Sequence, residues 1–393
     1  MPDSSHNSPR SLMHWGVLAL VLLNVGLLAL TNPTRAISAG FVVEPDLSPR
    51  DPSTTPIYES RFVGAGVPAF SHSASMVEIS DGRLRAFWMG GGSHEGKSDV
   101  AIYTALFDPA TNAWTRETPI IQVDDSQRHL HRNIHTVGNA TIHKFDSGRL
   151  LLWYVSVSVG GWAGSSINMI HSDDDGETWS APKRLVTSPF FNLSSLVKSP
   201  PVRFTDGTIG LPIYHEFMGK FCELLRLTPD GKVLHKQRLT KGRRTLQPAI
   251  IPRSETEATA FLRRSDKAPR RAITVATSDG GLSWGEPLIL DMPNPGSPIS
   301  ALRLDTGELL IVFNNVPRKR DKLTLAISSD EGVTYDIIKE IESKGDHLSN
   351  GFGYPWLMQS STGQFHLLYT WRRERIKHLT FNRAWLEQNR SSR

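Results

Sequence analysis

Side chains able to do chemistry recur in this sequence where short apolar stretches begin or end. They are His72, Glu95, Asp99, His215, Glu216, Gln247, Arg263, Asn315, Arg320, Tyr354, Trp371 and Arg372. Arginines bind a carboxylate in a fork geometry, and a carboxyl group can give and take a proton. Gathered around one pocket, this set would suit the hydrolysis of an acidic sugar. Because these residues lie far apart in the sequence, that chemistry needs a fold that brings them together.

A short phrase written three times indicates such a fold. It reads Ser172-Asp-Asp-Asp-Gly-Glu-Thr-Trp179, Thr277-Ser-Asp-Gly-Gly-Leu-Ser-Trp284 and Ser328-Ser-Asp-Glu-Gly-Val-Thr-Tyr335. The Asp can accept hydrogen bonds from turn amides, the Gly can supply a positive φ, and the aromatic residue can pack between neighbouring sheets. The phrase therefore predicts a turn that occurs once in each structural unit, and Asp174, Asp279 and Asp330 are expected to be structural.

The spacing of two repeated signals predicts the architecture. Weaker copies of the phrase stand at Leu227–Gly231 and Asp108–Trp114. In antiphase, hairpin turns are predicted at Asp81-Gly82, Ser147-Gly148, Asp206-Gly207, Pro252–Glu257, Thr306-Gly307 and Thr362-Gly363. Together the signals give six units of roughly 50 to 65 residues, which predicts an all-β, six-bladed β-propeller over residues 61–385. A β-sandwich with decorated turns is the alternative, but it gives no reason for a repeat that stays in phase.

A propeller would gather the candidate residues at one end of its axis. The loops entering the innermost strands and those leaving the second strands surround a common pocket. Because Arg263 and Arg264 alternate across a strand, only one of them can face the axis. His215 and Glu216 could be pocket walls without a chemical part, and Tyr354 could be a packing residue between blades.

The N-terminal region differs in kind from the rest. Residues 12–31 form an apolar run behind a polar head, residues 1–11, that carries Arg10. This layout predicts a hydrophobic helix that is either a signal anchor or a signal peptide, with the head in the cytoplasm. The propeller would then be membrane-anchored or exported, at the periplasmic or cell-surface side. Residues 32–60 are expected to be a linker, and residues 386–393 a tail.

Composition limits the partners. The chain of 393 residues has 44 Lys and Arg against 39 Asp and Glu, a formal net charge of +5 that suits anionic partners such as glycans. No aromatic stacking platform accompanies the basic residues, so nucleic acid is not expected as a partner. The single Cys222 excludes an intramolecular disulfide. The histidines do not fall at metal-ligand spacings, so we expect neither a metal nor another cofactor.

The repeated phrases are the Asp-boxes of sialidases, and from about residue 60 to 385 the chain resembles the sialidase-like family with BNR repeats. The resemblance rests also on particular stretches, namely His72–Ser75, Glu95-Gly96 with Asp99–Tyr103, Tyr214–Glu216, Asn314-Asn315 with Arg320, and Tyr354–Leu357. It implies an exo-acting glycoside hydrolase (neuraminidase) that removes a terminal sialic acid with retention of configuration, using a Tyr nucleophile.

The resemblance also implies roles for individual residues. Tyr354 matches the nucleophile, and Arg263 and Arg320 match arginines that clamp the sugar carboxylate. Either Asp99 or Glu95 would be the general acid and base; the sequence register favours Asp99, and the Gly-rich loop favours Glu95. The others of the set are expected to contact substrate, namely His72, Gln247, His215, Asn315, Trp371 and Arg372.

Two departures from the family pattern keep alternatives open. Ser71-His72-Ser73 stands where the family has an arginine, and Gln247 stands where it has the glutamate that activates the tyrosine. Glu216 could replace the missing base, and His72 the missing arginine. Otherwise the chain would be a non-catalytic glycan-binding propeller or a hydrolase of a different glycoside.

Overall fold

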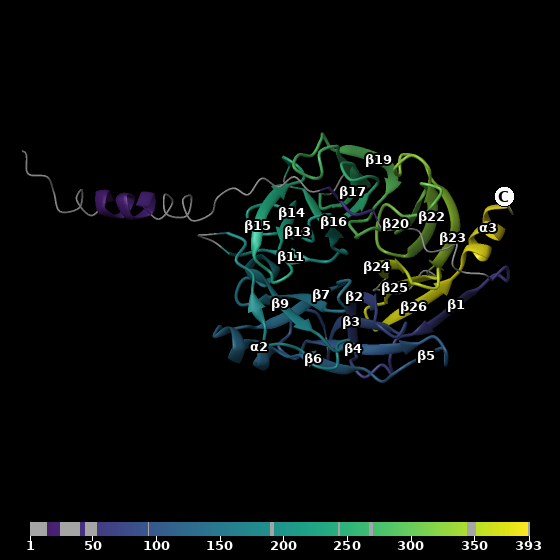
Figure 1. Cartoon of the computed structure of the whole chain (residues 1–393), viewed down its shortest axis with the longest axis horizontal. Helices are drawn as coiled ribbons and strands as arrows, with labels where there is room; N and C mark the ends of the chain where they lie inside the picture. The colour runs from purple at the N-terminus through teal and green to yellow at the C-terminus, as the bar shows by residue number, and fades with distance from the viewer. Residues whose placement is uncertain are drawn as a thin grey trace, which may run out of the picture. The chain divides into compact units, whose positions relative to one another are not determined.

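The computed structural model describes residues 14–23, 40–43, 53–92, 94–188, 192–242, 244–266, 270–343 and 351–391. Residues 39–393 form one compact unit in which six antiparallel sheets succeed one another around a common centre (Figure 1). The predicted all-β, six-bladed propeller is confirmed.

Each blade is a meander in which successive strands of the chain lie further from the axis, except that the sixth blade takes its outermost strand from the other end of the chain. The first blade has β2 (Phe70–Glu78), β3 (Leu84–Gly91) and β4 (Ala101–Asp108), with β5 (Ala113–Trp114) and β6 (Thr118–Ile121) both paired to β4. The second has β7 (Thr136–Lys144), β8 (Leu150–Val157), β9 (Ser165–Ser172) and β10 (Lys183–Arg184). The third has β11 (Leu196–Val197) and β12 (Val202–Arg203), both on β13 (Ile209–His215), then β14 (Phe221–Leu227) and β15 (Val233–Arg238).

The remaining three blades repeat this pattern. The fourth has β16 (Thr245–Pro252), β17 (Ala258–Arg264), β18 (Arg271–Thr277) and β19 (Leu288–Pro293). The fifth has β20 (Ser300–Arg303), β21 (Leu309–Phe313), β22 (Lys322–Ser328) and β23 (Asp336–Ser343). The sixth has β24 (Phe352–Gln359), β25 (Phe365–Trp371), β26 (Arg375–Phe381) and, as its outermost strand, β1 (Tyr58–Phe62) from the other end of the chain.

The three Asp-boxes have one hydrogen-bond pattern. In the first box Asp174 accepts a hydrogen bond from the Thr178 amide at 2.9 Å, and the Gly176 amide donates to Ser172 Oγ at 2.8 Å. The second and third boxes repeat both bonds around Asp279 and Asp330. Gly176 has φ 89°, as the turn requires. The predicted structural role of these aspartates is confirmed.

Apolar side chains fill the spaces between neighbouring blades. The aromatic residue of the first box, Trp179, meets Phe87 of β3 edge to face, with ring centroids 5.6 Å apart. Phe87, Trp153 of β8 and Phe313 of β21 are fully buried. Because successive strand residues point to opposite faces, each sheet packs one face against the next blade. This packing holds the six blades together.

Two parts of the predicted linker, residues 32–60, belong to the propeller unit. β1 begins at Tyr58 and pairs with β26 from Tyr58↔Phe381 to Phe62↔Lys377. Phe41 is fully buried and stacks on Phe204 at 5.0 Å. The linker prediction was wrong for these two segments. A composition rich in Pro, Ser and Thr does not show that short stretches pair with strands far away in the sequence.

The helices are few and short. Residues 14–23 form a helix, and among the described residues no helix is long and apolar enough to cross a membrane. The rest of the predicted hydrophobic segment, residues 12–13 and 24–31, lies outside the described residues. In the propeller unit are α2 (Val123–Leu130), the 3₁₀ turn η2 (Gly161–Gly164) and α3 (Arg383–Ser391). Leu386, the first residue of the predicted tail, is buried in α3.

Candidate functional site

Four of the six innermost strands carry a bulge at the same level. Ser73 of β2, Asn139 of β7, Gln247 of β16 and Tyr354 of β24 have φ values of 56°, 46°, 49° and 56°. At each of them the register with the second strand shifts. A bulge re-aims side chains and is common beside active sites, and left-handed backbone at a residue other than Gly costs free energy. The shared strain marks this level of the propeller as the candidate site.

Gln247 joins Tyr354 to an arginine. Its Nε2 donates to the Tyr354 hydroxyl at 3.2 Å, and its Oε1 accepts from Arg263 Nη1 at 2.9 Å. Arg320 approaches the same tyrosine from the next blade, with its Cζ 5.2 Å from the ring centroid. The structure thus brings together Tyr354, Arg263 and Arg320. Arg264 instead pairs with Asp266, so Arg263 is the arginine that faces the axis.

A second phenol, which was not predicted as a site residue, lies on the other side of Gln247. The Tyr214 hydroxyl accepts from Asn139 Nδ2 at 3.0 Å and from Gln247 Nε2 at 3.4 Å. Burial raises the pKa of Tyr214 well above its ordinary value, and the nearby Tyr354 and Glu216 raise it further. Tyr214 is therefore a neutral phenol at physiological pH.

His72 packs directly on the tyrosine, with ring centroids 4.0 Å apart, and its Nδ1 lies 3.0 Å from the Thr370 hydroxyl. Burial lowers the pKa of His72 well below its ordinary value, and four surrounding cations lower it further: Arg373, Arg320, Lys198 and Arg263. A neutral imidazole cannot supply the charge of a missing arginine. In this structure the additional cations are Arg373 and Lys198.

Lys198, which follows β11, is almost fully buried. Its Nζ donates to the carbonyl of Pro355 at 3.1 Å and lies 5.4 Å from the ring centroid of Trp356. Burial lowers the pKa of Lys198 to about 7. An amine held against the residue next to Tyr354 therefore changes its charge near neutral pH.

The two candidate acids differ in their contacts. Glu95 is partly buried, and its carboxylate lies 3.5 Å from Arg373, one of the cations that act on His72. Asp99 is exposed, and its Oδ2 accepts from the Gly92 amide at 2.8 Å. Asp99 thus closes the loop on which Glu95 stands, whereas Glu95 is linked to the cations around Tyr354.

His215 and Glu216, at the end of β13, are engaged within the third blade. His215 Nε2 lies 2.6 Å from Glu223 Oε2, and its ring stacks on Phe221. The Glu216 carboxylate lies 3.6 Å from Lys220 Nζ. Glu216 is linked to the site by its electrostatic effect, which raises the pKa of Tyr214.

The fifth and sixth blades hold the remaining candidates. Asn314, the neighbour of the predicted Asn315, is fully buried and donates to the Phe352 carbonyl at 3.0 Å, which anchors the start of β24. Trp371 meets Phe62 of β1 edge to face, and Arg372 stacks over Trp371. No described contact joins Asn315, Trp371 or Arg372 to Tyr354.

Comparisons with known proteins agree with this architecture. Residues 82–367 match the model of the BNR repeat-like domain. No curated protein matches the chain. A protein of unknown function from Dyadobacter fermentans has a similar structure, with a TM-score of 0.66 and 14% identity over 82% of this chain and 98% of that one.

Sialidases have similar structures at equally low identity. The intramolecular trans-sialidase from Ruminococcus gnavus, solved with oseltamivir carboxylate, has a TM-score of 0.62 and 14% identity over 82% of this chain and 96% of that one. The Trypanosoma rangeli sialidase, solved with sialic acid, has a TM-score of 0.60 and 16% identity over 91% of this chain and 60% of that one. At such identities the likeness concerns the fold. The matched domain covers most of the propeller, and the chain therefore belongs to the sialidase-like BNR-repeat family.

Proposed function

We propose that the chain is an exo-acting glycoside hydrolase of the sialidase type, which removes a terminal acidic sugar from glycans outside the cytoplasm. The observation that carries the proposal is the set of cations around one phenol. Arg320 approaches Tyr354 directly, and Arg263 is linked to it through Gln247. Lys198 and Arg373 add positive charge around the neutral His72, which packs on Tyr354.

This arrangement suits an anionic substrate. A sugar that bears a carboxylate at its anomeric carbon would be drawn by the cations and held by the guanidinium of Arg263 or Arg320. A carboxylate nucleophile would meet the substrate against repulsion, whereas a neutral phenol would not. Tyr354 is therefore the better nucleophile for such a sugar.

The proposed reaction has two steps. The Tyr354 oxygen attacks the anomeric carbon while Glu95 gives its proton to the leaving oxygen, so a tyrosyl–sugar bond forms and the glycosidic bond breaks. Water then attacks the same carbon and gives a proton to Glu95, and the tyrosine leaves as a phenolate that takes a proton back from solvent. Gln247 is an amide and cannot accept the phenolic proton, which passes to solvent; the charge of Arg320 and Arg263 stabilises the developing phenolate.

The test is release of the aryl group from an aryl α-sialoside. Tyr354→Phe should abolish release and keep the fold, while Tyr103→Phe, on the outer part of the first blade, should leave the rate unchanged. A fluorinated sialosyl fluoride should add its mass to the peptide that contains Tyr354. Unchanged release by folded Tyr354→Phe would refute the proposal.

A glycan-binding propeller without hydrolysis is the second candidate, and the amide of Gln247 favours it. It predicts saturable binding of sialyl-lactose without product at any pH. Adduct formation on Tyr354 would exclude it.

A further inference from the structure

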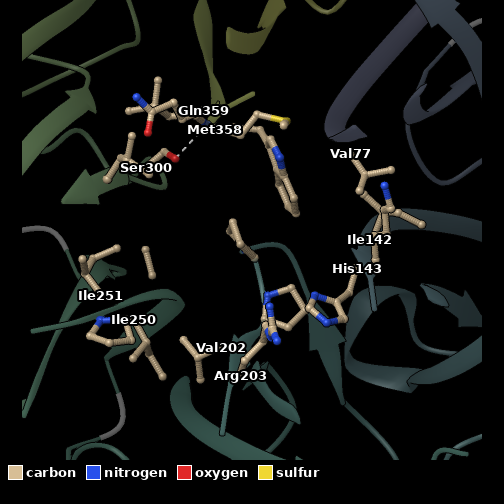
Figure 2. A pocket seen from close by; sticks show the side chains of 18 of the residues that line it. Val77, Ile142, His143, Val202, Arg203, Ile250, Ile251, Ser300, Met358 and Gln359 are labelled. Atoms are coloured by element: carbon tan, nitrogen blue, oxygen red, sulfur yellow. Dashed lines mark hydrogen bonds between the residues drawn. The ribbon is translucent and has the colours of Figure 1, made fainter. Parts of the chain in front are cut away.

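A hollow lies at the ends of the innermost strands that face away from the candidate site. A cavity of about 700 Å³ is bordered by residues from all six blades, at Met76–Glu78, Ile142–Asp146, Pro200–Arg203, Ala249–Pro252, Ser300–Arg303 and Trp356–Gln359, and by Val42 and Val43 (Figure 2). The bulges at Ser73, Asn139, Gln247 and Tyr354 stand before these segments on β2, β7, β16 and β24. The cavity therefore belongs to a different end of the propeller axis than the candidate site.

Its walls are mainly apolar. Val77, Ile142, Val202, Ile250, Ile251 and Met358 are among the side chains that surround it (Figure 2). Charged side chains also border the cavity, namely Glu78, Lys144, Asp146, Arg203 and Arg303. Its apolar part offers water few hydrogen bonds, whereas an apolar molecule would gain contact with the blades there. The volume lies within the range of pockets that bind one small molecule.

The polar groups at this cavity are largely satisfied by the protein. Arg203 Nη2 lies 2.7 Å from Asp146, and Arg303 Nη2 lies 2.9 Å from Glu331. Ser300 Oγ accepts from the Leu357 amide at 3.1 Å (Figure 2). Burial lowers the pKa of His143 to about 4, so its imidazole is neutral at pH 7. A charged ligand would have to compete with these partners.

One buried polar atom at the cavity has no partner among the described residues. It is Nε2 of His143, whose ring meets Phe145 edge to face. Because this atom is buried, a molecule in the cavity does not reach it, and it offers a ligand no hydrogen bond. The walls therefore describe an uncharged, mostly apolar molecule.

We propose that this cavity is a binding site for an uncharged, apolar small molecule, separate from the glycan site. Trp356 borders the cavity, and Lys198, whose amine lies over its ring, is held against Pro355 beside Tyr354. These two side chains form a packed layer between the two ends of the axis. The site needs no charge and no catalytic group, so it is independent of hydrolysis.

The experiment uses the full chain and the uncharged fluorophore N-phenyl-1-naphthylamine, with 1-decanol and decanoate as competitors. We expect saturable binding of one fluorophore per chain and displacement by decanol at concentrations at least tenfold below those of decanoate. Val77→Trp places a bulky side chain in the cavity and should weaken binding at least tenfold. Val186→Trp, the same change at an exposed valine outside the cavity, should bind as the wild type does.

Each other outcome overturns the proposal. Non-saturable fluorescence, or equal binding by Val77→Trp and Val186→Trp, would show that the fluorophore binds elsewhere. Preference for decanoate would assign an anionic ligand instead, with Lys144, which makes no ion pair with another described residue, as its partner. If Val77→Trp does not fold, as judged by circular dichroism, Ile251→Phe replaces it with the same expectation. The Tyr354→Phe variant should bind the fluorophore unchanged, which separates this result from the test of hydrolysis.

Discussion

At the scale of single residues, the loop of the first blade offers two carboxyl groups for one role. Glu95 is linked to the cations around Tyr354 through Arg373, while Asp99 is bonded to the backbone of its own loop. We expect Glu95→Gln to lower kcat for sialyl-lactose by about 10²–10³-fold, the usual contribution of a general acid. Asp99→Asn, the matched change, should keep most of the activity.

The dependence of the activity loss on the leaving group distinguishes a general acid from a structural residue. An aryl group with a low pKa leaves without protonation, so Glu95→Gln should lose far less activity on such an aryl sialoside than on sialyl-lactose. Equal losses on both substrates, or a larger loss in Asp99→Asn, would assign the role to another group.

Lys198 makes stability depend on pH. Its pKa is about 7 in the folded protein and 10.5 ordinarily, so between these values the unfolded chain binds a proton that the folded chain does not. The free energy of unfolding should therefore rise with pH across this window, by at most about 1.4 kcal/mol per pH unit from this group. Urea denaturation between pH 6 and 10 measures the slope. Lys198→Met should remove this part of the slope and be relatively most stabilised at pH 6. Identical slopes would contradict the lowered pKa of the Lys198 amine.

At the scale of elements, the bulges make a testable claim about strain. Ser73 has left-handed backbone and Ser75, on the same strand, does not; the hydroxyls of both are buried without a partner in the described structure. Replacing either serine with Gly removes a buried hydroxyl group. The difference in stability between the two variants therefore reports the cost of the left-handed backbone at Ser73. Ser73→Gly should be more stable than Ser75→Gly by about 1–2 kcal/mol, the cost of left-handed backbone for a residue with a Cβ. Thermal unfolding of both variants measures it, and equal values would show that the bulge is unstrained.

The same elements show what the sequence could and could not predict. The Asp-box turns and the blade count follow from local chemistry, because Asp174 and Gly176 make their bonds within a few residues. The bulges were not predicted, although Pro248 and Pro355 carry a signal, since Pro inside a central strand is found at bulges.

The charges of the site depend on contacts between blades. His72 is neutral because burial and cations from four other segments act on it, and no local pattern reports this. Arg373 and Lys198 were missed for the same reason, since their partners Glu95 and Pro355 lie far away in the sequence. Arg263 could be chosen over Arg264 only once Gln247 and Asp266 were placed.

At the scale of the whole molecule, ring closure allows two separate sites on one axis. Four innermost strands, β2, β7, β16 and β24, contribute one end to the level of Tyr354 and the other end to the apolar cavity. Both sites therefore depend on six blades keeping their positions, and the position of the last blade depends on β1, which comes from the opposite end of the chain (Figure 1).

Closure can be weakened at one hydrogen bond. The Val63 amide donates to the Ile376 carbonyl, so the alternation of an antiparallel ladder places the Glu59 amide towards β26 and the Ser60 amide away from it. Glu59→Pro removes a donor and leaves the Thr380 carbonyl unpaired, which should cost about 1–3 kcal/mol.

Ser60→Pro removes no bond within the sheet and should cost less, and Glu59→Ala accounts for the lost carboxylate. Differential scanning calorimetry should rank Tm as Ser60→Pro above Glu59→Pro, with fluorophore binding and sialoside release lost together as each variant melts. If Glu59→Pro melted as the wild type does, β1 would not be the strand that closes the ring, and the coupling of the two sites through closure would fall with it.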